Sequence, residues 1–123
     1  MLDLHKYDAE FWNSIDALVA QSTVVIDRPK GSEHPRYPGF FYPIDYGYLD
    51  GTASMDGGGI DVWVGSDPQR KADAVMCIVD LNKKDSEIKI LLGCSDEEKR
   101  LIYEVHNENR MKGILIKRTE QNL

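Results

Sequence analysis

Apolar residues near the N-terminus recur with the period of an α-helix. They are Phe11, Trp12, Ile15, Leu18 and Val19. This spacing gathers them into one stripe along a helix, with polar residues on the opposite side. The sequence therefore predicts an amphipathic helix. Its stripe packs either on the chain's own sheet, which is the simpler arrangement, or on a neighbouring molecule.

The rest of the chain consists mostly of short apolar segments separated by turn-forming residues. Predicted strands cover 23–27, 44–49, 60–65, 75–81, 87–93 and 113–118. A second helix is expected over 96–107, where Ser95 and Glu98 have the spacing of a capping box. Many short strands with glycine-rich turns predict a mainly β fold of the α+β class: a small closed or partly closed barrel with one N-terminal and one C-terminal helix. Strands and helices do not alternate, so a doubly wound parallel sheet is not expected.

Length and charge limit the functional classes. A chain of 123 residues is expected to form a single domain, 1–123. A net charge of -6 argues against binding nucleic acid through its phosphates. No apolar run reaches membrane-spanning length and the N-terminus lacks a signal-peptide core, so a cytoplasmic protein without a membrane partner is expected. Cys77 and Cys94 lie in apolar surroundings, which favours free buried thiols.

Two aspartates flank a run of three glycines. Asp56 precedes Gly57, Gly58 and Gly59, and Asp61 follows after one isoleucine. A loop that folds back here brings both carboxylates to one hard cation, and oxygen ligands of this kind suit Mg²⁺. A simple hairpin turn with a solvated Asp56 explains the same residues equally well. Asp61 shares a strand face with Trp63 and is expected to be partly enclosed, so it needs a partner. A cation is the favoured one.

Acidic and basic residues also gather around the strand at 87–93. Asp80 precedes it, and Asp85, Glu87 and Lys89 share one face, whereas Ile88, Ile90 and Leu92 are expected to point into the core. Two interpretations stay open. The charges form a surface ladder, or they complete a metal and phosphate site begun by Asp61.

Tyrosines and basic residues supply further candidates for binding phosphate. Tyr42, Tyr46 and Tyr48 share parity, although most tyrosines in strands are packing residues with one wet end. Arg28, Lys30 and Arg36 are candidate phosphate contacts, because a guanidinium matches phosphate oxygens in a fork. Of these, Arg36 lies just before the tyrosine segment and is favoured.

These segments together resemble the soluble, Mg²⁺-dependent inorganic pyrophosphatases of family I, as a short and divergent member. The likeness covers roughly 23–93 and is sharpest over 41–64, where Phe-Tyr-Pro-x-x-Tyr-Gly-Tyr leads into Asp-Gly-x-x-x-Asp-Val. The resemblance implies a five-stranded barrel of the OB type with flanking helices. It also implies hydrolysis of pyrophosphate to two phosphates, with several Mg²⁺ ions, or Mn²⁺ in their place, and a metal-activated water. Relatives often form homo-oligomers, so a homo-oligomer is a candidate assembly.

The resemblance also assigns roles to residues. Asp56 and Asp61 match metal aspartates, Asp80 resembles a later one, and Asp27 matches a glutamate that reaches a metal through water. The last metal ligand is Asp85 or Glu87. The phosphate-binding positions fall on Tyr46, Lys89 and Arg36, and the catalytic set is Asp61, Asp56 and Tyr46.

Departures from the family pattern lower the expected activity. Gly58 stands where the family has an aspartate that orients the attacking water, and Gly59 replaces the following proline. Val105, His106 and Asn107 stand where the family has a Tyr-Lys pair, and one phosphate arginine has no clear counterpart. We therefore expect a weak pyrophosphatase. The alternatives are a hydrolase of another phosphoanhydride and a non-catalytic module that binds a phosphate ligand.

Overall fold

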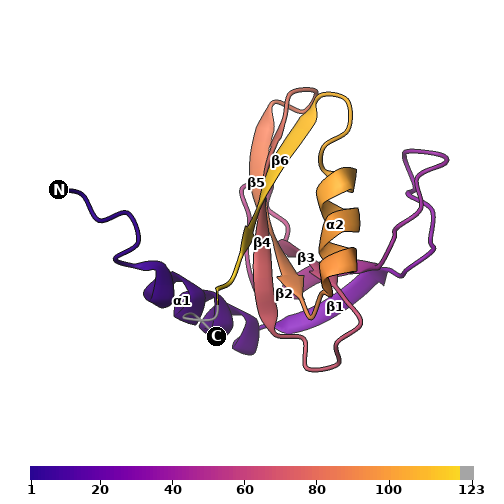
Figure 1. Cartoon of the computed structure of the whole chain (residues 1–123). Coiled ribbons are helices and arrows are strands. Elements are labelled where there is room, and N and C mark those ends of the chain that lie inside the picture. The colour runs from indigo at the N-terminus through magenta and orange to yellow at the C-terminus, as the bar shows by residue number, and fades with distance from the viewer. Residues whose placement is uncertain (120–123) are drawn as a thin grey trace.

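The structure, a computed structural model, describes residues 1–119, which form two helices and six strands (Figure 1). In chain order they are α1 (Asp8–Ala20), β1 (Thr23–Arg28), β2 (Asp45–Asp50), β3 (Ile60–Val64), β4 (Ala72–Asp80), β5 (Asp85–Leu92), α2 (Asp96–Val105) and β6 (Met111–Lys117). Neither helix is long and apolar enough to cross a membrane. The predicted mainly β fold with one helix towards each end is confirmed.

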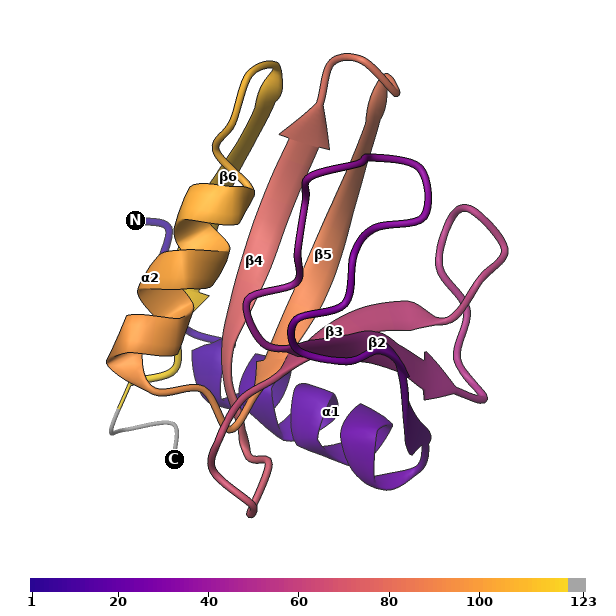
Figure 2. The same cartoon turned by 90° about the vertical axis from the view of Figure 1, so that its right-hand side faces the viewer.

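All six strands belong to one sheet, in the order β1-β2-β3-β5-β4-β6. Neighbours are antiparallel except β3 and β5, which run parallel. The sheet is strongly twisted, so that β1–β3 cross the direction of β4–β6 (Figure 2). Of the closed and partly closed barrels expected from the sequence, the closed form is not observed, because within residues 1–119 the end strands, β1 and β6, do not pair with each other. The sheet also has six strands rather than the five that the family resemblance implies.

The two helices cover opposite faces of the sheet (Figure 1). Trp12 and Ile15 of α1 are buried in a cluster with residues such as Val62 of β3. On the other face, Ile102 of α2 is buried in a second cluster with residues such as Trp63. The apolar stripe of α1 therefore packs on its own sheet, which confirms the simpler of the two arrangements predicted from the sequence.

The start of α2 follows the capping rule that its sequence predicts. The Ser95 hydroxyl accepts a hydrogen bond from the Glu98 amide at 3.1 Å, and the Glu98 carboxylate accepts one from the Ser95 amide at 2.8 Å. These bonds satisfy two amides that the first turn leaves without helical partners. The helix ends at Val105, two residues before the predicted end at 107.

One predicted core residue lies on the surface. Ile88 points to the face that α1 covers, but its side chain is 51% exposed. It lines up across the strands with Cys77 and Ile114, and these residues line an open apolar groove beside Phe11. The strand period set the face of Ile88 correctly, but α1 is too short to cover the whole of it.

The outer edge of β6 is partly occupied by a side chain. The Asn107 amide nitrogen donates to the Gly113 carbonyl at 3.1 Å, and the Gly113 amide donates to the Asn107 side-chain oxygen at 3.1 Å. This pair of bonds also ties the end of α2 to the strand that follows it. Cys77 and Cys94 are both free, as expected, with Cys94 buried and Cys77 half-buried.

We expect Gly47→Ala to destabilise the fold strongly. A Cβ at Gly47 would lie 1.8 Å from the Val25 carbonyl oxygen, so β1 and β2 would have to separate. The expected loss in free energy of unfolding is about 3 kcal/mol or more, measured by urea denaturation. Gly51→Ala serves as the comparison, because a Cβ there meets open space and only the positive φ costs about 1 kcal/mol. Equal losses in the two variants would contradict the close approach at Gly47.

Candidate functional site

A pocket of about 460 Å³ lies on the face of the sheet that α2 covers. Its other borders are the loop between β1 and β2 and the turn after α2. The sequence-predicted site residues that line it are Tyr46, Asp56, Asp61, Asp80, Asp85, Glu87 and Lys89. The fold thus brings together side chains from β2, β3, β4, β5 and the glycine-rich turn.

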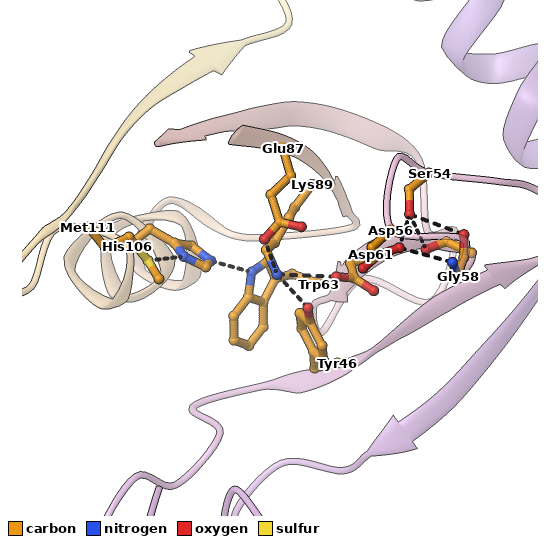
Figure 3. Close-up of polar contacts among 11 residues, drawn as sticks. Tyr46, Ser54, Asp56, Gly58, Asp61, Trp63, Glu87, Lys89, His106 and Met111 are labelled. Atoms are coloured by element: carbon orange, nitrogen blue, oxygen red, sulfur yellow. Dashed lines mark hydrogen bonds and ion pairs between the residues drawn. The ribbon is translucent and has the colours of Figure 1, made fainter. Parts of the chain in front are cut away.

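Lys89 lies at the centre of this set (Figure 3). The residue is only 7% exposed. Its ammonium donates to the Tyr46 hydroxyl at 2.5 Å and contacts carboxylate oxygens of Asp61 at 3.3 Å and Glu87 at 3.2 Å. We call Lys89, Asp61, Glu87 and Tyr46 the Lys89 cluster. The sequence analysis expected Asp61 to need a partner. Within the described residues, the Lys89 ammonium is such a partner.

Strand register explains why the cluster forms. Tyr48 pairs with Asp61 across β2 and β3, and Val62 pairs with Ile90 across β3 and β5. Side chains alternate between the two faces of a strand, so Asp61 and Lys89 project from neighbouring strands on the same side. Glu87 lies two residues before Lys89 and shares its face, as the sequence predicted.

The electrostatics of the cluster favour one more cation. Burial, followed by the charge of the Asp61 carboxylate, raises the pKa of Tyr46 far above its usual value. The phenol therefore stays protonated and keeps a hydrogen to donate while it accepts from Lys89. Two carboxylates beside one ammonium leave a formal excess of one negative charge, which attracts cations to the cluster.

Asp56 lies in a tight turn and also lines the pocket, so features of both interpretations drawn from the sequence, the turn and the candidate cation ligand, are present. Its carboxylate accepts hydrogen bonds from the Ser54 hydroxyl at 2.6 Å and from the Gly58 amide at 2.9 Å, inside a tight turn (Figure 3). The Ser54 hydroxyl, then the Gly58 amide, lower the pKa of Asp56. Asp56 nevertheless lines the pocket, so its turn delivers an ionised carboxylate to the rim.

Asp80 and Asp85 lie together at the turn between β4 and β5, where they are paired in register. One Asp80 oxygen accepts from the amides of Asn82 at 2.9 Å and Lys83 at 3.1 Å. Those bonds give Asp80 a role in forming the turn, which the sequence did not predict. Asp80 also lines the pocket.

Two predicted residues do not line the pocket. Asp27 is exposed on β1, where its carboxylate lies 4.0 Å from the Arg28 guanidinium. Arg36 is exposed in the loop between β1 and β2, and its amide donates to His34 Nδ1 at 3.0 Å. The loop that carries Arg36 borders the pocket, but neither the Arg36 nor the Asp27 side chain lines it.

The oxygen-rich lining has the chemistry that Mg²⁺ prefers, since hard cations take carboxylate and water ligands. Within residues 1–119, however, no three side chains of histidine, cysteine, aspartate or glutamate already surround one point. The carboxylates of Asp61 and Glu87 are turned to Lys89, and that of Asp56 is turned to its own loop. The residues present fit a divalent cation in kind, and binding one would require these carboxylates to exchange partners.

A buried pair that sequence reasoning missed supports the site from behind. Trp63 Nε1 donates to His106 Nε2 at 3.1 Å, and His106 Nδ1 lies 3.3 Å from the Met111 sulfur (Figure 3). An indole N–H only donates, so His106 must accept at Nε2 and carry its proton at Nδ1. Burial, then the charge of Lys89, lowers the pKa of His106 to about 3. No local sequence signal links residues 43 positions apart.

The family and fold comparisons agree with one another. A family model described as inorganic pyrophosphatase matches residues 19–122. Inorganic pyrophosphatase structures from Neisseria gonorrhoeae (14% identity), Helicobacter pylori (16%) and Thermus thermophilus (16%) each superpose with a TM-score of 0.58. They cover 78%, 79% and 79% of this chain and 80%, 85% and 81% of their own chains, respectively. At such low identities the structures show a shared fold. No curated protein sequence matches the chain.

We expect His106 to make stability depend on pH. Its folded pKa of about 3 lies below the value near 6.5 in unfolded chains, so its contribution is complete above pH 6.5 and is lost as pH falls towards 3. Between pH 7.5 and 5.5 the loss is about 1 kcal/mol. Urea denaturation at both pH values should show that His106→Gln, which keeps an acceptor for Trp63, removes this part of the loss. An identical pH dependence in both proteins would contradict a buried neutral His106.

Proposed function

The chain belongs to the inorganic pyrophosphatase family, and we propose that it hydrolyses inorganic pyrophosphate to two phosphates in an Mg²⁺-dependent reaction. The observation that carries this proposal is the Lys89 cluster. It places an ammonium, a neutral phenol and two carboxylates at one end of a pocket whose remaining charged lining is mostly acidic. An ammonium and a phenol donate to phosphate oxygens, and the carboxylates suit the cations that must accompany a polyanion.

The proposed roles follow from what each side chain offers. Lys89 and Tyr46 bind phosphate oxygens, and Tyr46 is suited to this because its phenol remains protonated. Asp56 and Asp61, together with Asp80, Asp85 and Glu87 on the pocket wall, hold Mg²⁺. Mn²⁺ is a candidate substitute, because it accepts the same oxygen ligands. Bound Mg²⁺ would neutralise phosphate charge and make a water molecule more acidic.

The two remaining predicted residues fit a supporting role. We propose that Asp27 reaches a metal ion only through water and that Arg36 contacts phosphate only after its side chain turns towards the pocket. Both assignments match the exposed positions of these side chains outside the pocket lining. Lys89 must also change partners during substrate binding, since its present hydrogen-bond acceptors belong to the protein.

The glycine-rich turn explains why the expected activity is low. Gly58 has no group to orient the attacking water, and losing such a base typically costs on the order of 10²–10⁴-fold in rate. A Cβ at Gly58 would meet only the Asp56 carboxylate, at 3.3 Å, so a side chain fits there with a small shift. Gly59 differs, since a Cβ there would lie 2.7 Å from the Leu49 carbonyl oxygen. Packing against β2 therefore disfavours the family's proline at this position.

We predict that Asp61→Asn abolishes hydrolysis. The substitution keeps the size of the side chain but removes the charge that holds a cation and pairs with Lys89. Phosphate release from pyrophosphate, measured with Mg²⁺, with Mn²⁺ and with a chelator, should be metal-dependent in the native chain and fall at least about 100-fold in the variant. Asp50→Asn, at the exposed end of β2, is the matched control and should keep the native rate. Unchanged turnover in Asp61→Asn would exclude the proposed metal site.

We also predict that Gly58→Asp raises the rate of phosphate release by about tenfold or more, because it restores a carboxylate where water is to be oriented. Gly58→Asn is the matched control, since it has the same shape without the base. Equal effects of the two substitutions would contradict a role in activating water. No activity in the native chain or in Gly58→Asp, at any metal concentration, would favour a binding module over an enzyme.

A further inference from the structure

The loop between β1 and β2 lines one side of the pocket with aromatic rings. We call His34, Tyr37, Phe40 and Tyr42 the aromatic wall, and all four line the pocket. The centroid of His34 lies 4.6 Å from that of Tyr37 and 6.0 Å from that of Tyr42, on which it is stacked. Tyr42 is in turn stacked on Tyr46 at 5.2 Å. A continuous series of rings therefore runs from the pocket rim to the Lys89 cluster.

The aromatic wall is held in place by the backbone of its own loop. The His34 amide donates to the Phe40 carbonyl at 2.9 Å, and the Tyr42 amide donates to the Ser32 carbonyl at 2.9 Å. The Gly39 amide donates to the Glu33 carboxylate at 2.9 Å. The loop is thus a small hairpin on the same side of the sheet as α2 (Figures 1 and 2). A wall ordered in advance loses little freedom when a ligand binds.

Tyr37 is not a core residue, so packing in the core does not explain why a tyrosine stands at this position. Its side chain is 56% exposed, although it lies at the rim of the pocket and against His34. Val105 and Met111 add apolar surface to the pocket lining from the end of α2 and the start of β6. A flat, partly apolar group entering at the rim would meet the exposed ring of Tyr37.

The pocket therefore has two chemically different ends. The Lys89 cluster suits phosphate and metal ions, whereas the aromatic wall offers ring faces that stack on planar groups. Pyrophosphate consists only of phosphorus and charged oxygens, so it gains little from ring faces. A volume of about 460 Å³ also lies within the range of pockets that enclose small organic ligands.

We propose that this pocket accepts nucleoside diphosphates, with the base stacked on Tyr37 and His34 and the phosphoanhydride at the Lys89 cluster. This substrate class rests on the proposed function for its chemistry. In the reaction, the oxygen of water bonds to the terminal phosphorus and the bond from that phosphorus to the bridging oxygen breaks. The products are a nucleoside monophosphate, inorganic phosphate and a proton released to solvent.

The test compares adenosine diphosphate with pyrophosphate in Tyr37→Ala. We expect the ratio of kcat/KM for adenosine diphosphate to kcat/KM for pyrophosphate to fall about tenfold, the effect of losing one stacking ring. Tyr103→Ala is the matched control, because Tyr103 is a 47% exposed tyrosine on α2 that does not line the pocket. Its ratio should stay at the native value. Binding of the non-hydrolysable α,β-methylene analogue, measured by calorimetry with Mg²⁺ and with a chelator, should weaken about tenfold in Tyr37→Ala alone.

The outcomes separate this inference from the proposed function. Hydrolysis of pyrophosphate without hydrolysis or binding of the adenosine compounds would overturn the nucleotide subsite and leave the pyrophosphatase proposal in place. An equal loss for both substrates in Tyr37→Ala would overturn it as well. If neither substrate is hydrolysed but the analogue binds through Tyr37, the subsite stands and the hydrolase proposal fails.

Discussion

The buried ammonium of Lys89 is the interaction on which the site depends. An ammonium that leaves water loses its hydration, and the loss is tolerated only when nearby groups replace it. Here the replacements come from three strands: Tyr46 on β2, Asp61 on β3 and Glu87 on β5 itself. These contacts form only when the three strands keep their register. The arrangement of side chains in the pocket therefore depends on the pairing of the strands in the sheet.

The same cluster sets the conditions for holding a polyanion. The chain carries a net charge of -6, and the pocket lining includes more acidic than basic side chains. Phosphate groups are repelled from such a surface unless cations intervene, and carboxylates that already face one ammonium are placed to attract more. If the site binds metal as proposed, its affinity for a phosphate ligand and its affinity for metal are coupled.

The sequence predicted local features well and long-range ones poorly. Strand alternation gave the shared face of Glu87 and Lys89, and capping chemistry gave the start of α2 at Ser95. The partner of Asp61 was beyond reach, because β3 and β5 pair in parallel across 28 residues and no short pattern encodes that contact. Ile88 shows the same limit, since a strand period fixes a face but not how far a helix covers it.

The family resemblance predicted the pocket residues better than it predicted the shape of the sheet. It identified seven of the side chains that line the pocket but implied a five-stranded barrel, whereas within residues 1–119 the sheet has six strands and stays open between β1 and β6. An open sheet has an edge, and free edges invite other strands to add to them. Asn107 already occupies the outward hydrogen-bonding groups of Gly113, near the start of β6. A strand adding along this edge would have to displace that side-chain amide, so Asn107 hinders edge-to-edge pairing at this point.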